Sequence, residues 1–321
     1  MLKQIMQAVR IYGYGGAEQL KLERIERPQP QAGEVLLRVY AAGVNPLDWK
    51  ICQGLLKGFM SITFPYTPGI EVAGVIEEVG PGVKIFEIGQ AVFGQCANGG
   101  YAEYVVASVD ALALKPQSMS FAEAATIPVG ATTAWRALFE HGGLTASQRV
   151  LIQGAAGGVG LFAVQLAKWR GAQVIGTART ANLDFVRDLG ADTVVDFTTT
   201  PVESVVQNVD LVLDGAGGET LLSSLAALRR GGTLISIAGP PPQAEAQAHG
   251  VRAMMIRSQP SSVILQMLTR LIDEGHLKVT VGKTFALSEV RQAHEYGQNG
   301  HGRGRIVLQI ADEREDTFAA E

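Results

Sequence analysis

The sequence predicts an α/β protein in two parts, a compact and mostly β domain and a doubly wound parallel sheet, and three observations support this fold class. The chain has 321 residues, more than the roughly 250 to 300 at which a single hydrophobic core stops growing. Its first third consists of short apolar runs separated by Gly and Pro, which is typical of strands joined by turns. From about residue 121 to residue 258, strand and helix patterns alternate, as in a parallel sheet with crossover helices.

The composition argues against several classes of protein and partner. With 47% hydrophobic and 18% charged residues and no long uninterrupted apolar run, the chain is typical of a soluble globular protein, and no membrane partner is predicted. A net charge of -4 without a cluster of Lys and Arg argues against nucleic acid. Cys52 and Cys96 cannot form a disulfide framework, and residues 1–7 carry no secretory signal, so a cytoplasmic location is predicted.

Apolar runs give the order of the expected elements. In the first domain, strands are expected at residues 35–40 and 72–79, the second closed by a Gly-Pro-Gly turn. In the second domain, nearly continuous apolar runs predict strands covered on both faces, at residues 149–153, 173–177, 193–197, 210–214 and 233–238. The expected elements that follow are a Pro loop at 240–242, a strand at 251–256, a helix from Ser261 to about Glu274, a strand at 305–310 and a frayed acidic tail.

A glycine-rich turn directly follows the run at residues 149–153 and opens a helix whose apolar stripe includes Phe162, Val164 and Leu166. The turn consists of Gly154, Ala155, Ala156, Gly157, Gly158, Val159 and Gly160. Alone, such a turn is common and need bind nothing. Between a strand and a helix, however, its glycines permit a tight turn, close approach of a pyrophosphate and close packing, while the helix N-terminus attracts phosphate. This context predicts a dinucleotide site.

The strand at 173–177 leads into Ala178, Arg179 and Thr180, where a dinucleotide site reads the adenosine ribose. No acid follows until Asp184, which periodicity places inside the next helix. Arg179 can pair with a 2'-phosphate, and the hydroxyls of Thr177 and Thr180 can add hydrogen bonds. NADPH is therefore predicted rather than NADH, the alternative being that Arg179 is a solvated loop residue.

Six segments together make the chain similar to the medium-chain dehydrogenase/reductase superfamily, in its zinc-free quinone oxidoreductase (zeta-crystallin-like) branch. They are GVNPLD at 43–48, PGIEVAG at 68–74, GGYAEY at 99–104, ATTAW at 131–135, the glycine-rich turn, and GRGRIVL at 302–308. The resemblance implies a GroES-like β-barrel catalytic domain into which a Rossmann domain is inserted. The predicted division is 1–121 and 261–321 for the catalytic domain and 122–260 for the NADP-binding domain, with the active site in the cleft between them.

The resemblance also predicts the reaction. Zinc alcohol dehydrogenases of this superfamily have a cysteine at the position of Asn45 and a histidine at that of Ile70, and neither residue here is a suitable zinc ligand, so no metal is predicted. Without a Lewis acid, the substrate must itself accept hydride readily, as a quinone or an enone does. The residues expected to bind the substrate oxygen are Asn45, Lys50 and Tyr66, with Asp48 positioning them. Lys50 stands where relatives often carry tyrosine, and the alternative for Lys50 and Tyr66 is a plain surface role.

For the cofactor, the resemblance implies that Thr133 and Gly239 lie near the nicotinamide and that Arg303 approaches the phosphates, although Gly239 also fits a plain turn. Three functions remain open: an NADPH-dependent quinone oxidoreductase, an NADPH-dependent 2-alkenal or enone reductase, and a non-catalytic nucleotide-binding protein of the crystallin kind. A homodimer is expected, because members of the family often pair the edges of their nucleotide-domain sheets, for which the run at 251–256 is suited.

Overall fold

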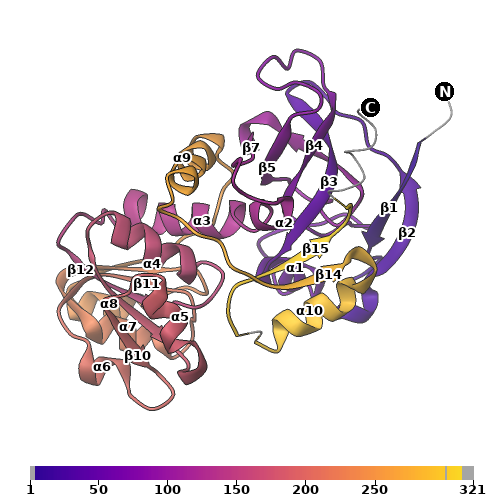
Figure 1. The fold of residues 1–321 in the computed structure, drawn as a ribbon. Coiled ribbons are helices and arrows are strands. Elements are labelled where there is room, and N and C mark those ends of the chain that lie inside the picture. The colour runs from indigo at the N-terminus through magenta and orange to yellow at the C-terminus, as the bar shows by residue number, and fades with distance from the viewer. Residues whose placement is uncertain (1–3, 301, 313–321) are drawn as a thin grey trace.

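The computed structural model describes residues 4–300 and 302–312 and has two bodies, each built on its own sheet. In Figure 1 the chain starts in one body, builds the second and returns, so that strands from both ends of the sequence lie side by side. Most of the predicted acidic tail lies outside the described residues. No helix among the described residues is long and apolar enough to cross a bilayer.

The first body is antiparallel for the most part. Its larger sheet has the order β14-β15-β3-β4-β5-β7, with β6 also paired to β3, and β1 pairs with β2 separately. The strands are β1 (Ile5–Arg10), β2 (Lys21–Glu26), β3 (Glu34–Val44), β4 (Glu71–Val79), β5 (Ala91–Gln95), β6 (Tyr104–Ser108), β7 (Leu112–Leu114), β14 (Val281–Ala286) and β15 (Arg305–Gln309). The helices are α1 (Pro46–Cys52), α2 (Phe121–Ala124) and α10 (Val290–Gln298), with short helical turns at Ala17–Gln19, Val109–Ala111 and Leu287–Glu289.

The pairing of β15 with β3 brings the C-terminal strand into the N-terminal domain. Val307 lies opposite Gly43 and Leu308 opposite Ala42 in an antiparallel register, and β14 pairs in parallel with the other edge of β15. The strands expected at 35–40, 72–79 and 305–310 are confirmed as β3, β4 and β15. The boundaries of the domains at 121/122 and 260/261 stay predictions.

The second body is a sheet of six parallel strands in the order β10-β9-β8-β11-β12-β13. In chain order this is 3-2-1-4-5-6, the doubly wound arrangement that the sequence predicts. The strands are β8 (Arg149–Gln153), β9 (Gln173–Ala178), β10 (Thr193–Asp196), β11 (Val209–Asp214), β12 (Leu228–Ser236) and β13 (Arg252–Met255). The helices are α4 (Gly160–Trp169), α5 (Leu183–Asp188), α6 (Val202–Val205), α7 (Thr220–Ala227) and α8 (Gln243–His249), with a short helical turn at Thr180–Asn182.

One strand boundary was wrong by several residues. The apolar run predicts a strand at 233–238, but β12 begins at Leu228 and ends at Ser236. The Ser236 hydroxyl donates to the Gly239 carbonyl at 2.6 Å and accepts from the Gly239 amide at 3.3 Å, which turns the chain away from the sheet. Local hydrogen bonding by a serine side chain therefore ends the strand before its apolar residues do.

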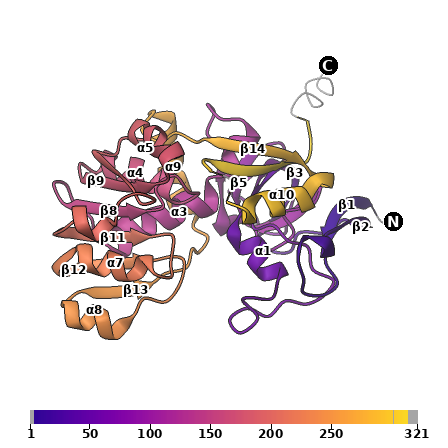
Figure 2. The same ribbon diagram turned by 90° about the horizontal axis from the view of Figure 1, so that it is seen from below.

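Two further helices lie between the bodies. In Figures 1 and 2, α3 (Pro128–Trp135) runs from one body to the other, and a π-helical turn at Arg136–His141 continues it. The helix expected from Ser261 is α9 (Ser262–Asp273), whose N-cap hydroxyl on Ser261 accepts from the Ile264 amide at 3.3 Å. It contacts both α3 and β7.

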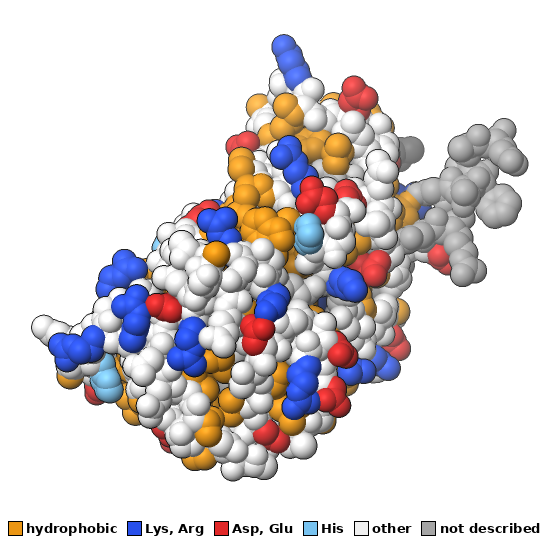
Figure 3. Space-filling view, turned by 60° about the vertical axis from the view of Figure 1, so that its left-hand side comes forward, with side chains coloured by type: hydrophobic (Ala, Val, Ile, Leu, Met, Phe, Trp, Pro, Cys, Tyr) orange, Lys and Arg blue, Asp and Glu red, His pale blue; other side chains and the backbone are white. Residues whose placement is uncertain are grey.

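Figure 3 shows charged side chains of both signs interspersed over the nucleotide-domain face, with hydrophobic side chains gathered higher on the same face.

Candidate active site

The glycine-rich turn is held rigidly by the strand beside it. The Gly154 amide donates to the Thr177 hydroxyl at 3.1 Å, and the Ala155 amide donates to the Thr177 carbonyl at 2.9 Å. A Cβ on Gly160 would lie 2.3 Å from the Gly154 carbonyl oxygen, so the start of α4 approaches the turn too closely for any side chain. This is the close packing that the spacing of the glycines predicts.

The turn suits a pyrophosphate. The amides of Gly158, Val159 and Gly160 have no protein acceptor within the described part of the chain, and they begin α4, a helix of ten residues. Amides without acceptors at a helix N-terminus, together with the helix dipole, attract anions. The residues present therefore fit the phosphates of a dinucleotide.

The end of β9 differs in part from expectation. Thr177 is buried, and its hydroxyl donates to Gln153 Oε1 at 2.8 Å while accepting from Gly154, so in this structure it orders the turn rather than facing a ribose. Thr180 donates to Asp196 Oδ2 at 2.6 Å. Hydrogen bonds from Thr180 and Thr198 keep the pKa of Asp196 below its usual value. Sequence reasoning missed this carboxylate because parallel pairing brings the end of β10 beside the end of β9.

Arg179 stands at the same edge with its guanidinium 5.8 Å from the centroid of the Phe197 ring. Its side chain is exposed, which leaves the guanidinium accessible to an anion. Arg303 lies with its guanidinium 5.6 Å from the Phe185 ring of α5, and the neighbouring Gly302 carbonyl accepts from Asn182 at 3.3 Å. The structure thus brings Arg303 to the helix that follows β9.

The remaining predicted cofactor residues are Thr133 on α3 and Gly239 after β12. Thr133 is buried in α3 and donates its hydroxyl to the Val129 carbonyl at 2.6 Å. Gly239 follows β12, and a Cβ there would meet no protein atom within 4 Å. A small residue at 239 is therefore not required by packing within this chain, and the open space leaves room for a ligand.

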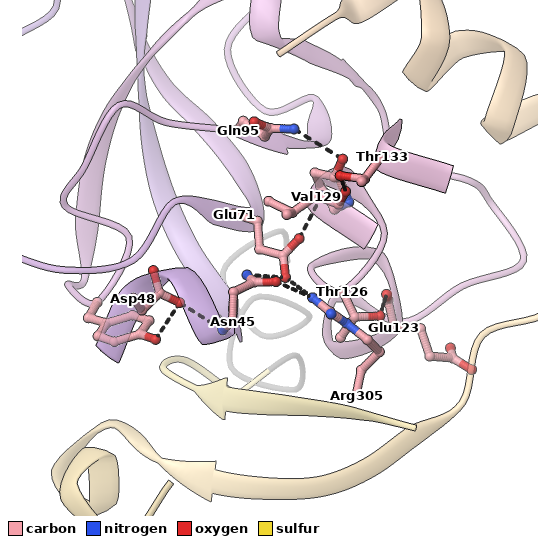
Figure 4. Close-up of polar contacts among 11 residues, drawn as sticks. Asn45, Asp48, Glu71, Gln95, Glu123, Thr126, Val129, Thr133 and Arg305 are labelled. Carbon is pink, nitrogen blue, oxygen red and sulfur yellow. Dashed lines mark hydrogen bonds and ion pairs between the residues drawn. The ribbon is translucent and has the colours of Figure 1, made fainter. Parts of the chain in front are cut away.

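Asn45 lies in a buried polar network that joins four elements (Figure 4). Asn45 Nδ2 donates to Glu71 Oε1 at 2.7 Å, and Arg305 Nη2 donates to Asn45 Oδ1 at 2.8 Å. Arg305 also forms an ion pair with Glu71 Oε1, while the Val129 amide of α3 donates to Glu71 Oε2 at 2.8 Å. Because an arginine can only donate, the side-chain oxygen of Asn45 must face Arg305 and its side-chain nitrogen must face Glu71.

Glu71 and Arg305 were not among the predicted site residues. Both are at least 96% buried, at 0% and 4% exposure, and charged residues are rarely buried unless they are paired. They lie in the PGIEVAG and GRGRIVL segments, 234 residues apart. A charge inside an otherwise apolar segment is the only signal in the sequence, and it does not name its partner.

Arg305 also touches the glycine-rich turn. A Cβ built on Gly158 would lie 2.3 Å from Arg305 Nη1. The guanidinium therefore packs directly against the backbone of the turn while it holds Glu71 and Asn45. One side chain connects the candidate substrate-binding network with the candidate phosphate site.

Asp48 contacts Asn45 and Tyr101, and its expected positioning role stays a prediction. Its Oδ2 accepts from the backbone amide of Asn45 at 2.8 Å and from the Tyr101 hydroxyl at 2.9 Å, while its buried Oδ1 has no partner within the described residues. Burial raises the pKa of Asp48 to about 7. Burial also lowers the pKa of His294, whose Nε2 lies 3.4 Å from the Tyr101 hydroxyl, to about 4.

The other two predicted substrate residues are less constrained. Tyr66 is 8% exposed. Its burial, and to a lesser extent the nearby charge of Asp48, raises the pKa of its phenol, which is neutral near pH 7. Lys50 is half-buried on α1, and its side chain makes no hydrogen bond or ion pair within residues 4–300 and 302–312. The structure therefore places Asn45 and Asp48 in one network, Tyr66 beside it, and leaves Lys50 outside it.

The positions compared with zinc ligands hold Asn45, whose side-chain oxygen and nitrogen are both engaged, and Ile70, which is hydrocarbon. Across the described ranges, no group of three or more His, Cys, Asp or Glu residues gathers in a way that would hold a metal ion.

Comparisons with known proteins match this architecture. Family models described as alcohol dehydrogenase GroES-like domain and zinc-binding dehydrogenase match residues 31–117 and 189–308. The chain is 33% identical to the chloroplast envelope quinone oxidoreductase homolog of Arabidopsis thaliana, over 96% of this chain and 100% of that protein.

Solved structures agree over the same length. The quinone oxidoreductase from Coxiella burnetii superposes with a TM-score of 0.88 at 31% identity, over 96% of this chain and 100% of that one. CurK enoyl reductase gives a TM-score of 0.88 at 30% identity, with the same coverage of both chains. These proteins are oxidoreductases of a superfamily that uses a nicotinamide cofactor. The chain belongs to the medium-chain dehydrogenase/reductase superfamily, in its quinone oxidoreductase branch.

Proposed function

We propose that this protein is an NADPH-dependent quinone oxidoreductase that transfers hydride to a quinone without a metal. The observation that carries the proposal is that the Asn45 side chain is held by hydrogen bonds to other residues. Both polar atoms of its side chain are committed to Arg305 and Glu71, and Ile70 at the second compared position has no donor atom. Such a donor set suits no Lewis acid, so the substrate must accept hydride unaided, which a quinone does.

In this proposal, residues of the chain bind the cofactor and orient the substrate. The bound nicotinamide would supply the hydride, and the Gly158, Val159 and Gly160 amides would hold its phosphates. Asn45 Nδ2 has two hydrogens and gives one to Glu71, so the second is free to donate to the substrate oxygen that gains charge. The Tyr66 phenol, whose pKa burial raises further above its usual value, is a second donor.

Turnover with purified protein tests the proposal. We expect loss of nicotinamide absorbance with NADPH and 1,4-naphthoquinone, slower loss with NADH, and an Asn45→Ala variant about a hundredfold slower in kcat. The matched control Asn98→Ala, an exposed asparagine of the same domain, should retain activity. Equal turnover by Asn45→Ala, or stoichiometric zinc in elemental analysis, would contradict the proposal.

A second candidate is an NADPH-dependent enone reductase, which the similarity to CurK enoyl reductase favours. An enone β-carbon would accept hydride at the same place, with the same donors on its carbonyl oxygen. A 2-alkenal in the panel separates the two: a much higher kcat/KM for the alkenal than for the quinone selects this candidate. Binding of NADPH without turnover of either substrate would select a non-catalytic protein.

The proposal includes a cytoplasmic homodimer. β13 is the last strand of its sheet, and within the described chain no strand pairs with its outer edge. An edge with unpaired amides and carbonyls is suited to pairing with a second copy. Sedimentation velocity should give a dimer, and Ala253→Pro in β13 should give a monomer.

A further inference from the structure

The turn that follows α1 exposes more apolar surface than a soluble enzyme needs. Leu55, Phe59 and Met60 are 65%, 74% and 43% exposed. They belong to residues 53–61, which we name the apolar turn. Exposed apolar residues scattered singly are common, but three within six residues mark a contact surface.

Hydrogen bonds between backbone groups hold the shape of the apolar turn. The amides of Leu55, Lys57 and Met60 donate to the carbonyls of Lys50, Gly54 and Leu56 at 3.0, 3.2 and 2.8 Å. Leu56, Ile62 and Phe64 pack inward on the core of the β domain. The outward apolar side chains therefore stand on a fixed base.

The charges along residues 49–70, which include the apolar turn, are of one sign. Residues 49–70 contain Lys50 and Lys57 but no Asp or Glu, in a chain whose net charge is -4. The nucleotide domain adds Arg257, whose guanidinium lies 4.9 Å from the centroid of the Phe59 ring. Aromatic and aliphatic side chains interspersed with cations are typical of surfaces that bind an anionic lipid headgroup region.

The apolar turn also contacts the nucleotide domain through Phe59 and Arg257. Arg257 follows β13 by two residues, at the carboxyl edge of the parallel sheet. Ligands of doubly wound sheets bind outside that edge. The contact between Phe59 and Arg257 therefore places the apolar turn where a substrate would enter.

We propose that the apolar turn docks this protein on the surface of an anionic bilayer. Leu55, Phe59 and Met60 enter the headgroup region, and Lys57 with Arg257 faces the lipid phosphates. Such docking needs no membrane-spanning helix and revises the expectation that no membrane partner exists. It goes beyond the proposed function, which it would serve by letting an apolar quinone pass from the bilayer to the cleft.

Vesicle flotation of the full chain tests the docking. With vesicles of equal phosphatidylglycerol and phosphatidylcholine, wild-type protein should float, and with phosphatidylcholine alone it should float at least tenfold less. The double variant Leu55→Ser, Phe59→Ser should lose at least tenfold in partitioning to the anionic vesicles. The matched control is Ile85→Ser, Ile88→Ser, because those side chains are 67% and 65% exposed but lie beside both Lys84 and Glu87.

The docking is overturned if wild-type protein does not float with anionic vesicles, or if the control pair loses as much as the apolar-turn pair. A change of sedimentation coefficient in Leu55→Ser, Phe59→Ser would assign the surface to a second copy instead and also overturn it. Circular dichroism confirms that each variant is folded. Because flotation needs no turnover, failure of the quinone assay would leave this result standing, and the reverse also holds.

Discussion

We expect Arg179 to decide the choice of cofactor. Replacing it with alanine should raise the KM for NADPH about tenfold or more, because a charge-assisted hydrogen bond contributes about 1.5 to 3 kcal/mol. The KM for NADH, which lacks the phosphate, should change less than twofold. Steady-state kinetics with both cofactors measures this.

A nearby arginine provides the control for Arg179. Arg187 lies on α5, is 53% exposed and pairs with Asp184 at 2.5 Å. Arg187→Ala should leave both KM values within twofold, because that guanidinium is already paired within its helix. If Arg179→Ala and Arg179→Asp keep the wild-type preference for NADPH, the phosphate is read elsewhere, and Arg303 becomes the next residue to test.

Asp48 should make stability depend on pH. Its folded-state pKa of about 7 is above the usual aspartate value of 3.8, so the folded protein retains the proton to higher pH than the unfolded chain. The stability due to this group is fully present below the unfolded pKa and is lost as pH rises through about 7. Asp48→Asn keeps an acceptor for Tyr101 and the Asn45 amide but removes the titration.

Urea unfolding from pH 5 to pH 8 measures this effect. The free energy of unfolding of wild type should fall relative to that of Asp48→Asn as pH rises, by at most about 1.4 kcal/mol per pH unit. All other groups are shared, so the difference between the two proteins isolates Asp48. A difference that stays constant with pH would mean that Asp48 is ionised throughout.

At the scale of single residues, the sequence identified candidate site residues better than it identified the residues that hydrogen-bond or pair with them. Asn45 and Asp48 were predicted and lie in one network, since both belong to a segment with a recognisable pattern. Glu71, Arg305 and Tyr101 were missed, because a residue's type does not reveal which distant side chain will neutralise or hydrogen-bond it. Thr177 was recognised as important, but its hydroxyl faces Gln153.

The glycine-rich turn is the element on which both halves of the site depend. In Gly158→Ala the new Cβ would lie 2.3 Å from Arg305 Nη1, so the guanidinium must leave Glu71 and Asn45 or the turn must move. We expect a loss of stability of about 1 to 3 kcal/mol and a lower kcat. Gly239→Ala is the control, since no atom lies within 4 Å of its Cβ, and it should change stability by less than about 0.5 kcal/mol. Urea unfolding that ranks the two alanine variants equally would contradict the contact.

Elements were predicted best where burial on both faces dominates. β8 has the predicted bounds, Arg149–Gln153, and β9 and β11 differ from expectation by one residue at one end. These central strands are continuous apolar runs, which leave a single interpretation. The start of β12 was missed because Leu228, which pairs with Val209, is separated from the next paired residue, Thr233, by a bulge of two arginines and two glycines that resembles a loop.

At the scale of the whole molecule, periodicity could order the elements but could not join the two ends of the chain. The pairing of β15 with β3 spans more than 260 residues, and nothing local to residues 305–309 names that partner. Family resemblance supplied the connection, and the register of β15 against β3 confirms the pairing. The buried pair of Arg305 and Glu71 adds a charge-neutralising contact inside the same closure.

That pair should be costly to break from one side. Glu71→Ala would leave the Arg305 guanidinium buried without a carboxylate, and loss of one partner of a buried pair destabilises a protein by about 3 to 5 kcal/mol. Glu71→Gln retains a hydrogen-bond acceptor and should cost less. The double variant Glu71→Leu, Arg305→Met removes both charges and should recover most of the loss, because apolar replacement of a buried pair is often close to neutral.

Urea unfolding of the three variants separates two roles for the pair. If it serves mainly the closure of the fold, the double variant should be nearly as stable as wild type. If it also orients Asn45, the double variant should be stable yet slow in quinone turnover, since Asn45 would lose both of its side-chain partners, Glu71 and Arg305. We expect the second result. A double variant with wild-type kcat would show that the network is structural alone, and Asn45 would then have to be oriented by another contact.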